Sequence, residues 1–454
     1  MKSPMSADPL PADRFSGRPG DATSSITARD NPLLARPLAA DAWTFPAGVT
    51  YLNHGSFGPA PLPVREAQQE WTDRLQSNPM DFYVRKLEEY LDAARERLGK
   101  FVGCAPQHLL FVDNATVGMN LVARSLPLQA GDEILANDHE YGAVLRIWRS
   151  RCQETGAQVI VPRLPDRLES ADDVIEPILK AVTPRTKLII ISQITSPTAI
   201  IFPVAKLCQK AKALGIPVCV DGPHAPAVVD LHLQSLGCDF YTASCHKWLS
   251  APLGSGFLYV HPRWQSRLKP VITSWGASLS GRATHWHDDF NWSGTRDYSP
   301  YLAIPAAIDF LLQPADQPLA ADRSRPVTTG AKVHHDPAKG QTRLQLFRER
   351  GHALARYARE QLIPRTGCTQ MIPDSPDWYG TMVACPLPDW ILAPEGGHFH
   401  PLQKTLWERY GIEVPIVNWR DRRWIRVSCH LYNTVEQVDR LLAALDELFA
   451  ELKR

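Results

Sequence analysis

Lys247 occupies a position at which a lysine amine could act as a nucleophile. The stretch DFYTASCHKWLSAPLGSGFLYV (239–260) places a Cys-His-Lys-Trp run between two apolar, strand-like segments. A lysine at the end of a strand can form a Schiff base with an aldehyde if its amine is neutral, and a partly desolvated site favours the neutral amine. A lone lysine after a strand is usually a solvated surface charge. The residues at the other strand ends must decide between these interpretations.

Two other strand-like segments end in polar residues. Asp221 closes the segment IPVCVD and is followed by Gly, Pro and His224. A carboxylate in this place can pair with a ring nitrogen and keep it protonated. Asn114, Ala115 and Thr116 follow the segment HLLFV, where they would open a helix whose N-terminus can bind phosphate. Each has a plain structural alternative, because Asp and Thr also cap helices and turns.

Aromatic rings follow a further segment. His139 and Tyr141, in NDHEYGA, come after the segment EILAN, and either ring can stack on another ring. Pyridoxal 5′-phosphate (PLP) requires an amine, a partner for its pyridine nitrogen, a phosphate site and a ring to stack on. The combination of these residues with Lys247 and Asp221 therefore predicts a PLP site, which none of them indicates alone.

The elements that must position these residues alternate along the chain. Short Ile, Val and Leu runs are separated by amphipathic helical segments, which predicts an α/β fold with a mainly parallel sheet covered on both faces. Ligands bind at the carboxyl ends of such strands. We expect a disordered leader over 1–40, an N-terminal segment and large domain over 41–310, a mobile polar insertion over 313–342 and a small α+β domain over 343–454.

Composition excludes several classes of partner. The 454 residues have a formal net charge of +1, which gives no reason to expect nucleic acid, and no apolar run is long enough to span a membrane. The nine cysteines form no CxxC pair, so we expect reduced thiols in a cytoplasmic protein. The histidines of HWHDDF and GGHFHP lack zinc spacing, and no metal is expected.

Several motifs together resemble the class V aminotransferase family, the fold type I PLP-dependent enzymes that include cysteine desulfurases and isopenicillin N epimerase. The resemblance extends over about residues 50–445 and favours the epimerase-like branch. Its motifs are YLNHGSFGPAP, FVDNATVGMN, DHEYGA, SQITSPTAIIFPV, VDGPHAP, ASCHKWLSAPLGSGFLYV, NWSGTRDYSPYLAIPAAI and RVSCHLYNTVEQVDRL.

The resemblance implies roles around the cofactor. Lys247 would bind PLP covalently and move the substrate's α-proton, Asp221 would pair with the pyridine nitrogen, and His224 would contact the ring's phenolic oxygen. Tyr141 is preferred to His139 as the stacking ring. The implied phosphate ligands are Ser244, His246, Ala115 and Thr116.

Further positions follow from the same resemblance. Gly294 and Thr295 match a segment that reaches the phosphate from a neighbouring subunit, which implies a homodimer with shared sites. Arg426 matches the arginine that grips the substrate's α-carboxylate, and a bidentate guanidinium suits that planar group. Asn53 and His54 match the stretch that lines the substrate side.

The expected function is that of a PLP-dependent enzyme acting at the α-carbon of an amino acid or peptide-like amino acid, as in isopenicillin N epimerase. Alternatives are a C–S lyase of the hercynylcysteine sulfoxide lyase or desulfurase type, and an aminotransferase. The segment YGIEVPIVNWRDRRWIR lacks the loop cysteine of desulfurases, which disfavours desulfuration through an enzyme persulfide. A non-catalytic PLP-fold binding or regulatory module is the alternative of another class, and the intact set of Lys247, Asp221, His224 and Arg426 argues against it.

Overall fold

The computed structural model describes residues 31–34, 37–316, 340–392 and 399–453. Its central feature is a seven-stranded sheet in the order β2-β8-β7-β6-β5-β3-β4. Every neighbouring pair is parallel except the two that involve β8. The strands are β2 (Leu109–Val112), β3 (Glu133–Leu135), β4 (Gln158–Ile160), β5 (Thr186–Ser192), β6 (Val218–Asp221), β7 (Phe240–Ser244) and β8 (Gly256–Val260). The predicted mainly parallel sheet is confirmed.

Helices cover both faces of this sheet because its strands are apolar at successive positions. In β5, Leu188 and Ile190 join the core beneath α3 (Ala115–Ser125) and α4 (Gly142–Thr155). The alternate residues of β5 join the opposite core with α5 (Ala171–Lys180) and α6 (Val204–Ala213). This alternation follows from the period of two along a strand. The arrangement brings the carboxyl ends of the parallel strands to one edge.

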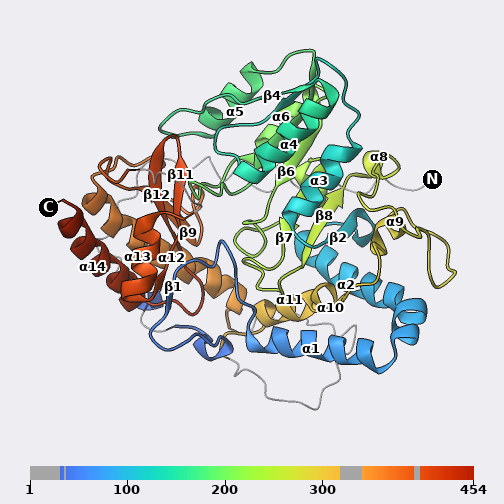
Figure 1. Ribbon diagram of the computed structural model, residues 1–454, viewed down its shortest axis with the longest axis horizontal. Helices are drawn as coiled ribbons and strands as arrows, with labels where there is room; N and C mark the ends of the chain where they lie inside the picture. The colour runs from blue at the N-terminus through green and yellow to red at the C-terminus, as the bar shows by residue number, and fades with distance from the viewer. Residues whose placement is uncertain (1–30, 35–36, 317–339, 393–398, 454) are drawn as a thin grey trace.

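A helical layer lies along the lower side of the large domain in Figure 1. It contains α1 (Leu62–Ser77), α2 (Leu87–Val102), α10 (Ser299–Leu302) and α11 (Ile304–Leu312), with a π-helical turn at Asp81–Lys86 before α2. The remaining short helices of this domain are α7 (Leu233–Leu236), α8 (Pro262–Gln265) and α9 (Asp288–Asn291). In the described residues, no helix has both the length and the hydrophobicity needed to cross a membrane.

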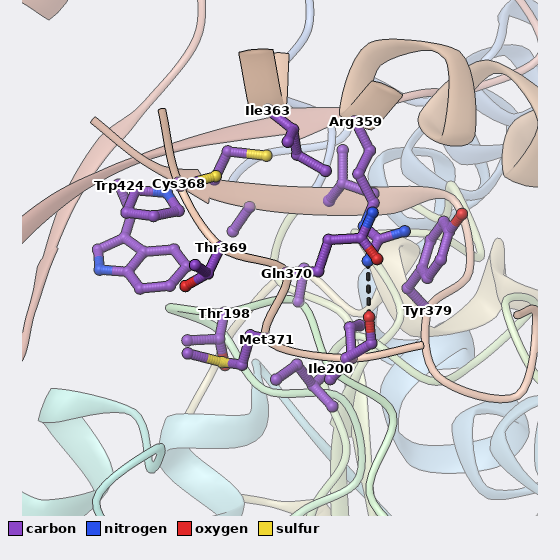
Figure 2. A pocket seen from close by; sticks show the side chains of 16 residues that line it. Thr198, Ile200, Arg359, Ile363, Cys368, Thr369, Gln370, Met371, Tyr379 and Trp424 are labelled. Carbon is purple, nitrogen blue, oxygen red and sulfur yellow. Dashed lines mark hydrogen bonds between the residues drawn. The ribbon is translucent and has the colours of Figure 1, made fainter. Parts of the chain in front are cut away.

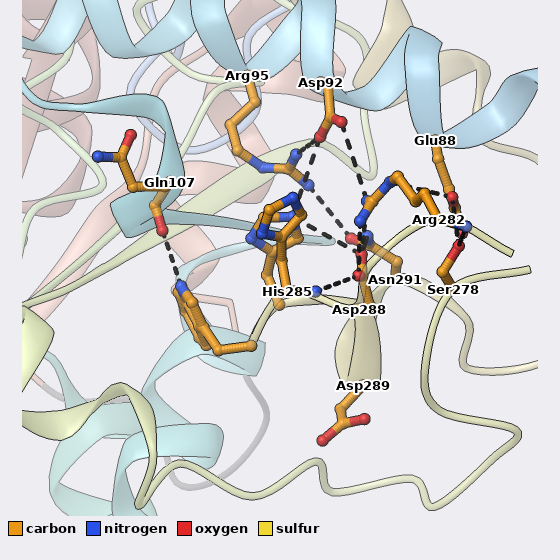
Figure 3. A network of polar contacts seen from close by, with 12 residues as sticks. Glu88, Asp92, Arg95, Gln107, Ser278, Arg282, His285, Asp288, Asp289 and Asn291 are labelled. Carbon is orange, nitrogen blue, oxygen red and sulfur yellow. Dashed lines mark hydrogen bonds and ion pairs between the residues drawn. The ribbon is translucent and has the colours of Figure 1, made fainter. Parts of the chain in front are cut away.

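An ionic network fixes the loop after α8 to α2 (Figure 3). Arg282 forms ion pairs with Asp288 at 2.9 Å and with Glu88 of α2 at 3.1 Å. Arg95 of α2 donates to the side-chain oxygen of Asn291 at 3.3 Å. Arg95 and Asp288 are almost fully buried, so these contacts hold the loop in one place against the sheet domain.

The small domain begins with a long helix and ends with another, and strands and a shorter helix lie between them. Its antiparallel sheet has the order β11-β12-β9, and a separate parallel pair joins β1 to β10. The strands are β1 (Thr50–Tyr51), β9 (Met382–Pro386), β10 (Ile412–Glu413), β11 (Ile416–Trp419) and β12 (Arg422–Ser428). The helices are α12 (Arg343–Thr366), α13 (Pro401–Tyr410) and α14 (Val435–Leu452). The N-terminal segment therefore pairs with the small domain.

The predicted leader and the predicted insertion each include residues that the structure describes. The leader predicted over 1–40 is wrong at its C-terminal end, because Leu34 is 5% exposed in the core and the Leu38 amide donates to the Leu431 carbonyl at 2.9 Å. Residues 1–30 lie outside the described residues. Within the predicted insertion, Pro314 and Thr342 form a β-bridge, and residues 317–339 lie outside the described residues.

Candidate active site

Lys247 lies in the turn between β7 and β8, at the carboxyl edge of the sheet. Its carbonyl accepts hydrogen bonds from the Ser250 amide at 2.8 Å and from His54 Nε2 at 3.1 Å. Its Nζ is 3.3 Å from His224 Nε2. Burial and the charge of Arg426 together lower the pKa of Lys247 to about 7, and Asp221 opposes both effects. A substantial fraction of the amine is therefore neutral and nucleophilic near neutral pH.

His224 is held in one tautomer. The indole Nε1–H of Trp248 donates to His224 Nδ1 at 3.2 Å, so the proton of the neutral ring lies on Nε2, which faces Lys247. Burial, with Lys247 and Arg426, keeps the pKa of His224 well below its usual range. The ring thus offers an N–H donor to whatever stands at the lysine amine, as expected for a contact to a phenolic oxygen.

Asp221 ends β6 as a buried carboxyl group with 3% exposure. Within the described residues, no hydrogen bond reaches its side chain. Burial raises its pKa well above the usual range, Glu140 raises it further, and Lys247 lowers it. A carboxylate without a donor in such a place suits a protonated ring nitrogen, which would supply both the charge and the hydrogen bond.

Arg426, on β12, brings a buried cation to the same site. Its Nη1 donates to the Ser196 carbonyl at 2.8 Å, and its Nη2 donates to the Ser56 hydroxyl at 2.6 Å. The residue is 4% exposed, its Nε has no partner, and no carboxylate of the described chain forms an ion pair with it. Burial lowers its pKa to about 10. A buried, unpaired guanidinium of this kind is stabilised by an anionic ligand.

The N-terminus of α3 lies at the same edge, where the sequence predicts a phosphate-binding element. The Ala115 amide donates to the Ser244 hydroxyl at 3.0 Å, and the Val117 amide donates to Asn114 Oδ1 at 3.1 Å. Thr116 is exposed between them on the first turn. The first amides of a helix favour an anion. The structure thus brings Ser244 and Ala115 together at this helix end.

His246 also stands at this edge, beside Lys247. Its side chain is half-buried, and its Nδ1 is buried without a hydrogen-bond partner. Burial and the charge of Lys247 lower its pKa to about 4. The ring is therefore neutral near neutral pH, and one of its nitrogens is free to take a ligand atom.

The two candidate stacking rings differ sharply in exposure. His139 is fully buried, with its Nδ1 2.9 Å from Thr198 Oγ1 and its ring 4.4 Å from that of Trp419. Tyr141 precedes the first turn of α4, is 46% exposed and acts electrostatically on Arg426. Tyr141 is therefore the more accessible of the two rings, and its role as the stacking ring stays a prediction.

The N-terminal stretch lies behind the lysine. His54 is fully buried, its Nδ1 is 2.9 Å from the Tyr432 hydroxyl, and its Nε2 holds the Lys247 carbonyl. Burial lowers its pKa to about 3. Asn53 is 6% exposed, and its Oδ1 has no partner. His54 thus positions the lysine turn, which differs from the expected lining of the substrate side.

Thr295 is exposed, and the neighbouring Gly294 has a φ of +113°, a conformation that favours glycine. Arg296 pairs with Asp113 at 2.5 Å, which ties this segment to the residues just before α3 of its own chain.

Sequence reasoning missed several site residues. Ser56 and Ser196 hold the Arg426 guanidinium, Trp248 orients His224, and Glu140 affects Asp221. All four occur within quoted motifs. Their roles depend on contacts between segments far apart in the chain, and no local pattern reveals such contacts.

A separate cavity lies on the other side of this region, between α12, β9 and the loop at 198–200 (Figure 2). Cys368, Cys385 and Met371 line it together with Arg359, whose Nη2 donates to the Ile372 carbonyl at 2.7 Å. The Cys385 thiol hydrogen-bonds the Cys368 sulfur. No predicted site residue lines this cavity.

The residues at the sheet edge fit PLP. An unpaired buried carboxyl group, a neutralised lysine, a helix N-terminus, a free imidazole nitrogen and a half-exposed ring converge there, as the cofactor's functional groups require. Beside them, Arg426 adds a site for a second anion.

The chain matches known proteins over most of its length. The family model described as aminotransferase class V matches residues 50–318. The chain is 36% identical to an isopenicillin N epimerase from Amycolatopsis lactamdurans, over 90% of this chain and 100% of that protein. It is 26% identical to a putative L-cysteine desulfhydrase from Oryza sativa subsp. japonica, over 92% of this chain and 87% of that protein.

Solved structures show the same fold. The cystine C–S lyase C-DES, in complex with its product cysteine persulfide, superposes with a TM-score of 0.68 at 22% identity, covering 88% of this chain and 97% of that chain. The cysteine desulfurase CsdA from Escherichia coli gives a TM-score of 0.66 at 22% identity, covering 89% and 95%. The predicted fold type I architecture is confirmed. The chain belongs to the class V aminotransferase family of PLP-dependent enzymes.

Proposed function

We propose that this enzyme removes and returns the α-proton of an amino acid or peptide-like amino acid and thereby inverts that carbon. The observation that carries the proposal is the buried Arg426 guanidinium, which lacks a carboxylate partner in the described chain and acts electrostatically on the Lys247 amine. A substrate α-carboxylate on Arg426 would place the α-carbon near that amine. The similarity to isopenicillin N epimerases supports inversion as the outcome.

The residues take separate roles in this proposal. PLP, when bound, supplies an electron sink that makes the α-proton acidic. Lys247 anchors it and later serves as the base, while Asp221 holds the pyridine nitrogen and His224 donates to the phenolic oxygen. The N-terminus of α3, with Ser244, Thr116 and His246, would hold the phosphate group. Of these groups, only Lys247 needs to change its protonation state during the reaction.

Inversion also requires a proton donor on the face opposite Lys247, and we assign this role to the phenol of Tyr141. The same ring is proposed to cover the cofactor. Tyr141→Phe retains the ring and loses the hydroxyl. We therefore expect this variant to keep α-proton exchange in D2O and to lose inversion. If inversion survives at the wild-type rate, the donor is another group.

The first experiment tests the cofactor and its lysine. Wild-type protein supplied with PLP should show a visible absorption band that borohydride removes, with the cofactor then fixed covalently to Lys247. Lys247→Ala should lack the band. Lys206→Ala, which changes a lysine on α6 that pairs with Asp172, is the matched control and should behave as wild type. If the wild-type protein binds no PLP, the proposed function is wrong.

The second experiment identifies the reaction. Isopenicillin N and a panel of L-amino acids are incubated with the PLP-loaded protein in D2O, and α-proton loss is followed by NMR and chiral chromatography. Approach to the same isomer mixture from either side supports epimerisation. Sulfide release from a sulfur amino acid, with a keto acid and free ammonia, identifies a C–S lyase. A keto acid formed without ammonia, with the amino group transferred to the cofactor, identifies an aminotransferase. PLP binding without exchange on any substrate favours the non-catalytic module.

One structural feature disfavours an enzyme persulfide. Cys245 and Cys429 lie beside predicted site residues, but both are fully buried, and burial raises the pKa of each thiol, in Cys429 to about 12. Neither is therefore a ready nucleophile.

We also propose a cytoplasmic homodimer in which Gly294 and Thr295 reach the partner's phosphate site.

A further inference from the structure

Glu140 is a second buried carboxyl group behind Asp221. It follows β3, is 5% exposed and lies between the two candidate stacking residues in the sequence. The Ser192 hydroxyl donates to its Oε1, and Ser192 is the residue that pairs with Asp221 across β5 and β6. Ser192 therefore lies beside both carboxyl groups, although Glu140 and Asp221 are 81 positions apart in the sequence (221 − 140).

The surroundings of Glu140 favour a neutral acid. Its Oε1 accepts from the Ser192 hydroxyl and from the Tyr141 amide at 3.1 Å, whereas its Oε2 is buried without any partner. An ionised carboxylate with a bare oxygen in a dry place is costly, and the protonated acid costs less. Burial raises the pKa of Glu140, as it does that of Asp221.

In the described residues, no cation forms an ion pair with Glu140 or Asp221, and Lys247 acts electrostatically on Asp221 alone of the two. Cys219 lies close to both carboxyl groups as an uncharged thiol. Two buried carboxyl groups in electrostatic contact cannot both ionise cheaply, so the pair retains a proton over a wide pH range. The position of that proton then depends on what binds to Asp221.

We propose that Glu140 and Asp221 together carry one negative charge, and that Glu140 holds the remaining proton whenever a cationic ring nitrogen is docked on Asp221. The proposal rests on the proposed function, which places the pyridine nitrogen at Asp221. Docking of an N–H cation stabilises the charge on Asp221 and moves the shared proton to Glu140. Glu140 is therefore a positioning residue, since it sets the charge beneath the ring without touching the cofactor.

The consequence is a pair that carries a single negative charge whether or not a cation is bound. While the site lacks a cation, the single charge can be distributed over two carboxyl groups. With a cation bound, the charge is concentrated where it pairs, and the neutral acid behind it adds no second negative charge. Without Glu140, a buried Asp221 would have two states. It would be either an unpaired carboxylate, which is costly to bury, or a protonated acid, which cannot pair with a protonated ring nitrogen.

Infrared spectroscopy detects the proton itself. The C=O stretch of a protonated carboxylic acid is separate from the amide and carboxylate bands and shifts in D2O. Glu140 and Asp221 are the two described carboxyl groups with a raised pKa. We therefore expect PLP-loaded wild type to show one such band at neutral pH and Glu140→Gln to lose it. The amide oxygen of the variant can still accept from Ser192 and Tyr141.

The matched control is Glu133→Gln. Glu133 is 2% exposed, and its carboxylate accepts hydrogen bonds from Thr183 and Arg185. These contacts hold its pKa below the usual range, so Glu133 is ionised. The acid band should survive in this variant. A loaded wild type without the band, or a loaded Glu140→Gln variant that retains it, overturns the proposal.

Two further measurements keep the test decisive. If Glu140→Gln does not fold, carbon-13 labelling of wild-type protein replaces it: the band should shift with labelled glutamate, and a shift with labelled aspartate contradicts the assignment. If wild type binds no PLP, the proposed function fails separately. The two carboxyl groups are then tested in cofactor-free protein. An acid band in wild type that disappears in the double variant Glu140→Gln, Asp221→Asn supports one shared proton. The lack of an acid band in cofactor-free wild type overturns the proposal.

Discussion

At the scale of single residues, the site is built from charges that lack their usual partners. Asp221 and Arg426 both act electrostatically on Lys247, and in the described residues none of the three forms an ion pair. Burial pushes Lys247 and Asp221 toward their neutral forms. Such displaced pKa values are typical of sites prepared for a charged ligand.

Capture of PLP should follow the neutral fraction of Lys247. The uptake rate is expected to rise with pH and to be half-maximal near pH 7, the value to which burial lowers its pKa. Arg426 lowers this pKa, so Arg426→Gln should move the curve to higher pH. Asp221 raises it, so Asp221→Asn should move the curve to lower pH. Stopped-flow absorbance across pH measures all three, and shifts in the same direction would contradict this electrostatic account.

Cys368 should be the most reactive thiol of the chain. A hydrogen bond from Cys385 lowers its pKa to about 6, and the other eight cysteines have raised values. Iodoacetamide at pH 7 should label Cys368 first, as read by peptide mass spectrometry. Cys385→Ala removes the donor and should slow labelling about tenfold. Cys152→Ala, a buried cysteine of α4, is the control, and an equal rate in both variants would refute the mechanism.

At the scale of elements, α3 depends on close contact with the sheet. A Cβ on Gly118 would lie 2.1 Å from Thr242 Oγ1 of β7, so the helix approaches the sheet at a glycine. Because the helix N-terminus is the proposed phosphate site, its distance from β7 sets the position of the anion. Packing and binding are therefore linked in this element.

Gly118→Ala should lift α3 from β7. We expect a loss of about 1–3 kcal/mol in the free energy of unfolding, as for overpacked cores, and weaker PLP binding. Gly142→Ala is the matched control, since a Cβ there meets nothing within 4 Å at the start of α4. Thermal unfolding and PLP titration measure both. Wild-type affinity in the Gly118 variant would show that the helix end does not hold the phosphate.

The elements also show what sequence can reveal. The positions of Asp221 and Lys247 were predictable because Asp221 ends one apolar strand and Lys247 comes shortly after another, and strand ends of a parallel sheet meet at one edge. The roles of His54 and Glu140 were not, because their partners, Tyr432 and Ser192, are distant in sequence. The pairing of β1 with β10 was missed for a related reason, since two-residue strands have no period to detect.

At the scale of the whole molecule, subunit exchange tests the shared site. If Thr295 acts on a partner's phosphate, mixing Lys247→Ala with Thr295→Glu should restore about a quarter of the sites, because each hybrid dimer contains one intact pair. The introduced carboxylate repels phosphate. Activity of the mixture against each variant alone is the readout. No recovery, with mixed dimers present by native mass spectrometry, would place Thr295 in its own chain's site.

The support behind Lys247 also constrains when the site can exist. His54 holds the lysine carbonyl, and it is itself held by Tyr432 and stacked on His430 at 4.0 Å. The lysine turn is therefore held by the N-terminal segment and the small domain together. A chain synthesised only as far as the large domain lacks His430 and Tyr432, so the support of its lysine turn is incomplete.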